Sequence, residues 1–325
     1  MLESYGGPEV LTLREVPDPE AGPEEVLVDV VATALNRADL SQRRGRYPGP
    51  PMAQEIPGME FSGRVAQVGD RARAWAVGDE VMGIVGGGAY AERLVVHERQ
   101  AMALPAAVDL ADAAAIPEVW ITAWDALVLQ GGLRSGHVAL VHAGASGVGT
   151  AAIQVAKAVG ARVAVTCSAS KAAACEALGA DLVVDYGRDD FVAGVKTLTG
   201  GAGVDVVLDV VGGDYVARNI DALRTGGRIV QVGLLAGPEA TFALGALLPK
   251  RASIIGTVLR SRPLEEKIAV SQRFAREVVP LFDAGLCRPV IDRRFSLDEI
   301  ADGHRYMETD ANVGKILVDV AGSRA

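Results

Sequence analysis

The stretch that decides the fold is Val141-His-Ala-Gly-Ala-Ser-Gly-Val-Gly-Thr-Ala-Ala-Ile-Gln154. It begins at the end of a short apolar run and continues into an alanine-rich segment. Gly144, Gly147 and Gly149 would let the backbone turn tightly and approach a pyrophosphate, and the helix that starts there offers unpaired N–H groups and a positive dipole end. The spacing of the glycines departs from GxGxxG, so the pattern alone is weak evidence. The motif is informative because of its position in the chain.

Outward from this loop, apolar runs alternate with segments of helical period. We expect helices at 149–159 and 171–178, and strands at 137–143, 162–167, 182–185, 204–211, 228–233 and 253–259. Near-continuous Val, Ile and Leu runs indicate strands that are buried on both faces, hence a parallel sheet with helices above and below it. Six such strands complete a doubly wound, nucleotide-binding α/β sheet.

The first third of the chain has a different character. Residues 25–34, 63–68 and 90–96 alternate apolar and polar side chains, and clusters of Gly and Pro separate them, which suggests a partly open barrel of short strands. The first strand would naturally begin before Leu2. The tail from Pro263 is expected to form a long helix and a strand at 315–320, and it is too short to fold alone. The expected division is therefore 1–117, 118–259, and 260–325 returning to the first domain.

Composition limits the function. Among 325 residues, 32 Lys+Arg stand against 41 Asp+Glu, a formal charge of −9, with 5% aromatic residues and no basic run. Nucleic acid and anionic membranes are poor partners for such a chain, which argues against an RNA-associating structural role. The three cysteines are too scattered for a disulfide framework or a metal cage. No apolar run approaches a membrane span of about 20 residues, and no secretory signal opens the chain, so the cytoplasm is expected.

The residues after the second expected strand indicate which dinucleotide binds. NAD enzymes usually carry an acid roughly 20 residues beyond the loop, where it binds the ribose. Here the strand ends in Ser168-Ala-Ser-Lys171, without an acid. Hydroxyls and a lysine favour a 2′-phosphate, so we predict NADPH. Tyr186 could complete that pocket. The alternatives are that Lys171 simply begins a helix and that Tyr186 is a surface residue.

With these residues in view, the chain resembles the zinc-free quinone oxidoreductases related to zeta-crystallin, in the medium-chain dehydrogenase/reductase superfamily. It looks closest to the subgroup of tumour-suppressor-induced NADPH:quinone oxidoreductases. The resemblance covers essentially the whole chain. Besides the glycine loop, the segments that carry it are Ala34-Leu-Asn-Arg-Ala-Asp39, Gly58-Met-Glu-Phe-Ser-Gly63, Ala114-Ala-Ile-Pro-Glu118, Thr122-Ala-Trp124 and Asn312-Val-Gly-Lys315.

The resemblance implies a GroES-like barrel built from both termini, a Rossmann domain, a homodimer, and an active site in the cleft between the domains. It implies that Asn36, Tyr47 and Thr122 lie near the nicotinamide. The cofactor contacts implied elsewhere are Gly144, Ser146, Gly147, Val148 and Gly149 at the pyrophosphate, Ser168, Lys171 and Tyr186 at the 2′-phosphate, and Val211, Gly233, Leu234, Leu259, Arg260, Ser261 and Asn312. Many relatives have Gly where Ser146 stands, and a serine hydroxyl can still donate to phosphate.

The zinc alcohol dehydrogenases of the same superfamily provide a contrast. Their catalytic zinc needs Cys and His ligands. The Cys position corresponds here to Asn36, the His position corresponds to Met59, and the cysteine-rich structural lobe is missing. An amide and a thioether cannot replace thiolate and imidazole, so we expect no zinc.

Without a Lewis acid, reduction of a simple ketone is poorly supported, whereas a quinone or an enone is already electron-poor. We therefore expect metal-free hydride transfer from NADPH to such an acceptor. Tyr47 would hydrogen-bond the acceptor oxygen and supply a proton, or would only shape the pocket. Asn36 would orient the substrate, or cap a turn. Quinone reduction and the runner-up, enoyl or alkenal reduction, differ in pocket shape, which the sequence does not reveal.

Three other candidates carry less weight. His142 lies beside the glycine loop, but it has no partner at ligand spacing, and packing at a strand end is its expected role. Cys167 has no adjacent base and is not expected to be a nucleophile. Of the two arginines near the last expected strand, Arg260 is expected to neutralise phosphate and Arg262 to lie at the surface.

Overall fold

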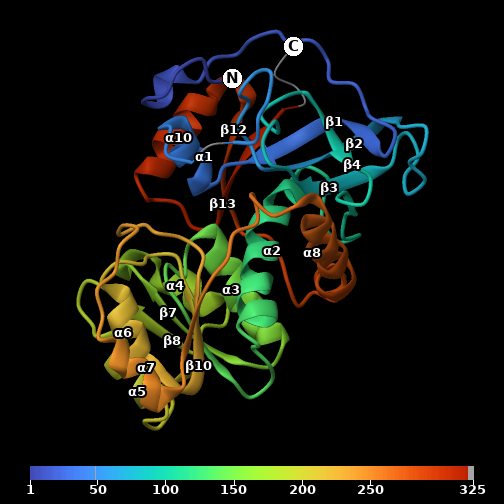
Figure 1. Cartoon of the computed structure of the whole chain (residues 1–325). Coiled ribbons are helices and arrows are strands. Elements are labelled where there is room, and N and C mark those ends of the chain that lie inside the picture. Colours follow the sequence, from blue (N-terminus) through green and yellow to red (C-terminus); the bar gives the residue numbers. More distant parts are fainter. Residues whose placement is uncertain (48, 321–325) are drawn as a thin grey trace. The chain divides into compact units, whose positions relative to one another are not determined.

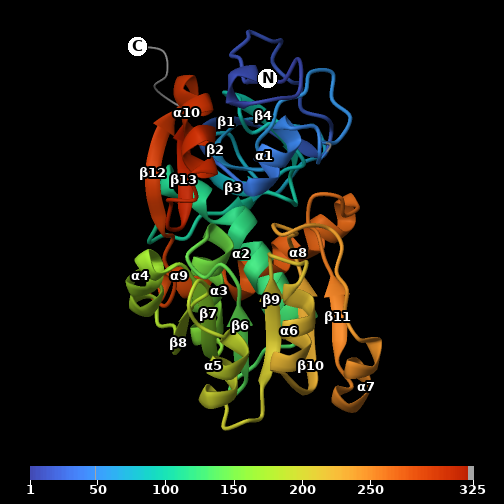
Figure 2. The same cartoon turned by 90° about the vertical axis from the view of Figure 1, so that its left-hand side faces the viewer.

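The glycine-rich stretch follows a strand of a six-stranded parallel sheet, as the sequence predicts (Figure 2). The computed structural model describes residues 1–47 and 49–320. The strand order is β11-β10-β9-β6-β7-β8, so the order reverses between the neighbours β6 and β9. The bounds are β6 Val138–Val141, β7 Arg162–Cys167, β8 Leu182–Asp185, β9 Val204–Asp209, β10 Leu223–Gln231 and β11 Ser253–Gly256.

Helices between these strands cover the sheet. They are α3 Gly147–Ala158, α4 Ala172–Ala177, α5 Phe191–Leu198, α6 Tyr215–Ala222 and α7 Leu247–Lys250. In α3 the alanines at 151, 152 and 156 are fully buried, and their small side chains let the helix lie close to the strands. Several expected strands end earlier than predicted, for example at Val141, Asp209 and Gly256.

The chain divides into two compact units (Figure 1). The central unit is Thr122–Leu259, and the terminal unit joins Met1–Ile121 to the segment that begins at Arg260. Helix α2, Pro117–Trp124, runs across the first boundary and continues as a π-helix, Asp125–Gln130. Residues 48 and 321–325, which fall within the predicted segments 1–117 and 260–325, lie outside the described residues.

The terminal unit contains a sheet in the order β12-β13-β1-β2-β3-β5, with β4 also paired to β1. The strands are β1 Glu25–Ala34, β2 Glu60–Val68, β3 Glu80–Ile84, β4 Arg93–His97, β5 Met102–Ala103, β12 Ile291–Ser296 and β13 Lys315–Asp319. The tail strand β13 pairs antiparallel with β1, Ala34 opposite Leu317, so residues from both chain ends share one sheet (Figure 1). The sequence reasoning missed β3, β5 and β12.

The helices of the terminal unit are α1 Arg37–Arg43, α8 Leu264–Glu277, α9 Val279–Asp283 and α10 Ile300–Glu308, with 3-10 turns at Pro8–Val10, Asp112–Ala115 and Leu297–Glu299. One apolar core joins β1, β2 and β13 with α1 and α10, centred on residues such as Val28, Phe61 and Ile316. Among the described residues, no helix has both the length and the apolar character needed to cross a membrane.

Candidate cofactor and acceptor sites

The loop between β6 and α3 needs glycine at two positions because of what lies next to them. A Cβ on Gly144 would lie 2.6 Å from the Cβ of Val165 on β7. A Cβ on Gly149 would lie 2.3 Å from the carbonyl oxygen of Ala143, a distance that real atoms do not reach. Ala143 itself has a left-handed backbone, with φ of 55°. The loop is therefore packed tightly between the sheet and the start of the helix.

The start of α3 offers unpaired donors to an anion. Ser146 is the N-cap residue, and its Oγ accepts a hydrogen bond of 3.0 Å from the N–H of Gly149. The N–H groups of Gly147 and Val148 belong to the first turn and have no acceptor within the helix. The hydroxyl hydrogen of Ser146 can still donate, because Oγ uses a lone pair for Gly149. These residues fit a diphosphate.

The carboxyl ends of the parallel strands bring the predicted cofactor residues of the central unit to one edge of the sheet. Each follows the end of a strand: Gly144 and Ser146 follow β6, Ser168 and Lys171 follow β7, Tyr186 follows β8, Val211 follows β9, Gly233 and Leu234 follow β10, and Leu259 follows β11. Ligands of open α/β sheets bind at this edge.

The corner formed by β7 and β8 carries the residues expected at a 2′-phosphate. Cys167 and Asp185 are paired across the two strands, so Ser168 and Tyr186, which follow them, leave adjacent strand ends. Lys171 closes a 3-10 turn and is the N-cap residue of α4. Tyr186 is 57% exposed, which leaves its ring open to a ligand. The turn itself supplies hydroxyls and one ammonium group.

His142 lies next to the glycine loop, but both nitrogens of its ring have hydrogen-bond partners within the protein. Its Nε2 donates to Asn219 Oδ1 over 2.7 Å, and its Nδ1 lies 3.0 Å from the hydroxyl of Thr166. Asn219 in turn donates to the buried Asp209, which accepts the N–H of Val211 at 2.6 Å. Burial lowers the pKa of His142, so the ring is neutral. Neither ring nitrogen is left for a ligand.

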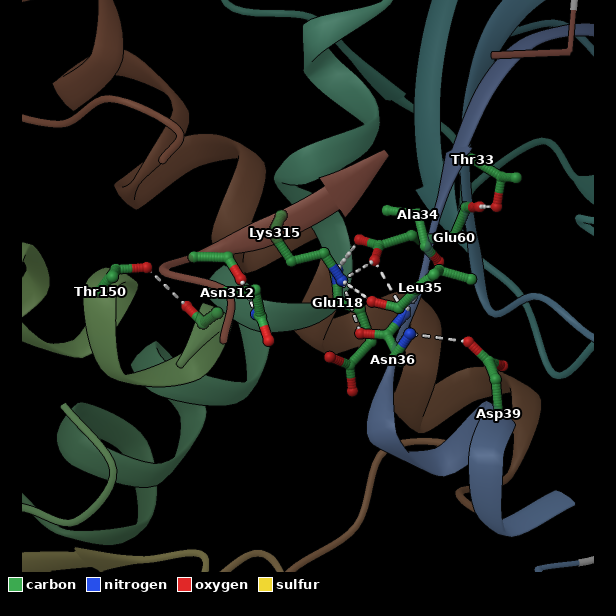
Figure 3. A network of polar contacts seen from close by, with 12 residues as sticks. Thr33, Ala34, Leu35, Asn36, Asp39, Glu60, Glu118, Thr150, Asn312 and Lys315 are labelled. Atoms are coloured by element: carbon green, nitrogen blue, oxygen red, sulfur yellow. Dashed lines mark hydrogen bonds and ion pairs between the residues drawn. The ribbon is translucent and has the colours of Figure 1, made fainter. Parts of the chain in front are cut away.

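In the terminal unit, Asn36 lies at the centre of a buried polar network (Figure 3). Lys315 Nζ donates to Asn36 Oδ1 and to the carbonyl oxygen of Leu35, each over 2.7 Å, and lies 2.7 Å from Glu60 Oε1. The side chains of Lys315 and Glu60 are 4% and 0% exposed. The second oxygen of Glu60 accepts the N–H of Glu118 over 2.8 Å.

These contacts decide what Asn36 can do. Its Nδ2 donates to Glu60 Oε1 over 2.9 Å and to the carbonyl oxygen of Ala34 over 3.3 Å, so both amide hydrogens are used. Its backbone N–H donates to Asp39 Oδ2 over 2.8 Å at the start of α1. Only one lone pair of Oδ1 remains. Asn36 can accept a hydrogen bond from a ligand but cannot donate one.

The hydroxyl of Tyr47 is differently placed. Among the described residues it has no hydrogen-bond partner, and the ring is half-buried beneath the guanidinium of Arg260, whose carbon lies 5.0 Å from the ring centroid. Burial raises the pKa of Tyr47. The phenol is therefore neutral at ordinary pH and can donate to a ligand.

The other predicted residues have varied positions. Thr122 lies on α2 and is 9% exposed. Asn312 precedes β13, and its Nδ2 donates to the carbonyl oxygen of Gly314 over 2.8 Å. Ser261 follows Arg260 and is exposed.

Sequence reasoning missed Glu60 and Lys315, although both lie in the quoted motifs. A signal existed, because each is a charged residue that opens a strand whose first four residues are buried, and a charge at such a position needs a partner.

The donor set around Asn36 does not fit a catalytic zinc. Within residues 1–47 and 49–320, no group of three or more His, Cys, Asp or Glu side chains is arranged to hold a metal ion. The side chains in contact there are the amide of Asn36 and the carboxylate of Glu60, which already contacts the Lys315 ammonium, and the residue before Glu60 is the buried thioether Met59. A second cation would be repelled there.

Comparison with known proteins gives two family matches. Residues 22–106 match the alcohol dehydrogenase GroES-like domain, and residues 147–276 match the zinc-binding dehydrogenase family. A quinone oxidoreductase of Pseudomonas aeruginosa is 34% identical over 97% of both chains. The rat synaptic vesicle membrane protein VAT-1 homolog is 32% identical over 98% of this chain and 83% of its own. The solved structure of Escherichia coli quinone oxidoreductase complexed with NADPH is 30% identical, covers 98% of both chains and has a TM-score of 0.88.

Proposed function

We propose that this chain, which belongs to the quinone oxidoreductase-like group of the medium-chain dehydrogenase/reductase superfamily, reduces quinones or related conjugated carbonyl compounds with NADPH and without a metal. Membership of that group makes the chain an oxidoreductase with a GroES-like and a Rossmann-type domain. The observation that carries the proposal is the start of α3. Its open N–H groups suit a diphosphate, and the next strand end offers a lysine and hydroxyls instead of an acid.

The proposed cofactor residues have separate tasks. The amides of Gly147 and Val148, with the hydroxyl of Ser146, hold the diphosphate. Ser168, Lys171 and Tyr186 hold the 2′-phosphate, where the ammonium group offsets the added negative charge. The remaining proposed contacts are Asn36, Tyr47, Thr122, Gly144, Gly149, Val211, Gly233, Leu234, Leu259, Arg260, Ser261 and Asn312. When bound, the reduced nicotinamide supplies the hydride.

The metal-free part of the proposal rests on Lys315. Its ammonium group lies 2.7 Å from both Asn36 Oδ1 and Glu60 Oε1, so a fixed positive charge already neutralises this carboxylate. No residue there can polarise an alcohol as a Lewis acid would, and the acceptor must be electron-poor on its own. Quinones and enones meet that requirement.

Tyr47 and Asn36 can then act on the acceptor in opposite senses. The neutral phenol of Tyr47 has a hydrogen to donate to an oxygen that gains negative charge. Asn36 Oδ1 can only accept, for example from an amide N–H or from a hydroxyl. We propose Tyr47 as the proton donor and Asn36 as an orienting acceptor.

We also propose a cytoplasmic homodimer. The strand β11 is the last in its sheet, and the apolar side chains around it are exposed, Leu244 by 70%, Leu248 by 77% and Ile254 by 39%. An exposed apolar edge strand suits pairing with a second copy. All three cysteines are free thiols, which fits a reducing compartment. The proposed partners are therefore small acceptors and another copy, not nucleic acid or membranes.

The experiment that tests the function is turnover of purified protein with NADPH and with NADH, across 1,2-quinones, 1,4-quinones and enones. Lys171→Ala should raise the KM for NADPH roughly ten- to a hundredfold and leave the KM for NADH nearly unchanged, since one charged hydrogen bond is lost. The control is Lys157→Ala, which removes an exposed lysine paired with Asp181 in the same unit.

Three outcomes would count against the proposal. Equal losses with both dinucleotides would remove the 2′-phosphate pocket. Turnover of enones without turnover of quinones would identify an enoyl or alkenal reductase. NADPH binding without consumption by any acceptor would favour a structural role.

A further inference from the structure

Arg260 is bound to the loop that carries Tyr47. Its guanidinium carbon lies 5.0 Å from the centroid of the tyrosine ring, and one of its terminal nitrogens donates to the carbonyl oxygen of Tyr47 over 3.4 Å. The arginine thus holds both the ring and the backbone of the proposed proton donor.

The same guanidinium joins two other segments of the terminal unit. Its Nε donates to the carbonyl oxygen of Gly86 over 2.6 Å, and a terminal nitrogen donates to Gln42 Oε1 over 2.7 Å. Gln42 lies on α1 and itself donates to Glu55 over 2.9 Å. Arg260 therefore links Gln42, the nearby Tyr47 and the more distant Gly86 through one side chain, which holds its position.

Glycine keeps the space around this arginine free. A Cβ on Gly49, two residues after Tyr47, would lie 2.9 Å from a terminal nitrogen of Arg260 and 3.0 Å from Gln42 Nε2. A Cβ on Gly87 would lie 3.7 Å from the same arginine nitrogen. Gly49 therefore leaves room for the guanidinium that a side chain would take, whereas a Cβ on Gly87 would be in ordinary contact with it.

The charges around Tyr47 act in opposite directions. Burial raises the pKa of the phenol, Arg260 lowers it, and Glu118 of α2 and Asp39 of α1 raise it further. Burial also lowers the pKa of Arg260, which Asp39 partly offsets. Arg260 is thus a cation that opposes the effect of burial on the phenol, and it makes the proton easier to release.

We propose that Arg260 is a positioning residue for Tyr47, which holds the phenol in place and promotes transfer of its proton to the acceptor. The inference rests on the proposed function and assigns Arg260 a role other than neutralising phosphate. With the hydride, the acceptor gains two electrons and one hydrogen. The O–H bond of Tyr47 then breaks as a new O–H bond forms on the acceptor oxygen, and the phenolate regains a proton from water.

The test compares Arg260→Met, Arg260→Lys, Tyr47→Phe and the double variant Arg260→Met/Tyr47→Phe. Arg260→Met should lower kcat on the order of tenfold, the size of one desolvated cation–π contact, and this loss should exceed any change in the KM for NADPH. Arg260→Lys should recover part of that loss. The control is Arg46→Met, which removes the same charge one residue from Tyr47, where the side chain is exposed.

Two readouts distinguish positioning from simple stabilisation. Removing a cation that lowers the pKa of Tyr47 should move the alkaline limb of the kcat profile to higher pH. The ultraviolet absorbance of tyrosinate, titrated with Tyr47→Phe as the blank, should shift in the same direction in Arg260→Met. In the double variant the losses should not add, because Arg260 acts through Tyr47.

Additive losses, or an unshifted tyrosinate titration, would overturn the proposal. A rise in KM for NADPH but not NADH would instead make Arg260 a phosphate ligand. If no acceptor is reduced, the proposed function fails, and the tyrosinate titration still decides whether Arg260 controls Tyr47. Circular dichroism of each variant, with Arg260→Lys as the milder change, separates these outcomes from loss of fold.

Discussion

Replacing Lys315 by methionine should destabilise the terminal unit severely. The ammonium group lies 2.7 Å from Glu60 Oε1, and the two side chains are 4% and 0% exposed. Methionine has a similar length but leaves the carboxylate buried without its counter-charge. Removing one partner of a buried pair typically costs about 3–5 kcal/mol. The carbonyl oxygen of Leu35 and Asn36 Oδ1 would lose their donor as well.

The assay is urea unfolding of Lys315→Met, Glu60→Gln and the double variant. In the double variant both charges of this pair are gone, so its free energy of unfolding should exceed the value expected from adding the two single losses. The comparison variant is Lys157→Met. Lys157 lies 3.0 Å from Asp181 at the surface, where the side chains are 40% and 26% exposed. Such a pair contributes about 1 kcal/mol or less.

The reasoning is refuted if Lys315→Met loses no more stability than Lys157→Met, or if the losses of Lys315→Met and Glu60→Gln simply add. Either result would mean that water or a rearranged side chain compensates the negative charge of Glu60. Lys315 would then not supply a fixed positive charge beside Asn36.

Three further predictions follow from other parts of the chain. Gly149→Ala places a Cβ 2.3 Å from a loop carbonyl oxygen. Fluorescence titration should therefore show that the variant binds NADPH and NADH about tenfold or more weakly. The control is Gly245→Ala, which has open space around it and should leave both affinities unchanged. Burial lowers the pKa of His304 to about 3, so the stability that this residue contributes to the fold is present above about pH 6.5 and is lost as the pH falls. Burial raises the pKa of Asp39 to about 6, so the stability that Asp39 contributes changes in the opposite direction and decreases as the pH rises from about 4 to 6. Asp39→Asn should therefore steepen the loss of stability between pH 6 and 4 in urea titrations, and an unchanged slope would contradict the assignment. Ile254→Lys should shift the protein toward monomers in light scattering if β11 pairs with a second copy.

How far the sequence could predict the site depends on how local the interactions are. The glycine loop was predictable because its requirements act within a few residues: the turn, the cap at Ser146 and the helix start are consecutive. The contact between Lys315 and Asn36 joins residues 279 positions apart. Composition and periodicity carry no information about such a pairing, and only the folded sheet brings β13 beside β1.

The missed strands show the same limit for secondary structure. β12 contains Arg293 and Arg294, both exposed, and it pairs in parallel with β13. Its residues do not alternate between apolar and polar, and three consecutive ones are exposed, so no period of two marks the strand. β5 is two residues long and has no period to detect. These strands exist because neighbours supply hydrogen-bond partners, not because their own side chains favour them.

The choice of acceptor lies beyond the sequence for a related physical reason. Lys315 contacts Asn36 and Arg260 contacts Tyr47, and each of the two cations donates to several protein oxygens. In the proposed arrangement these two cations fix the position and protonation of the residues that contact the acceptor. They do not themselves distinguish one acceptor from another. Discrimination between a quinone and an enone then falls to the shape left by the loops around Tyr47, where Gly49 leaves room for the arginine. Because a side chain at position 49 would disturb Arg260 as well as the pocket, a substitution there should change acceptor preference and proton delivery together.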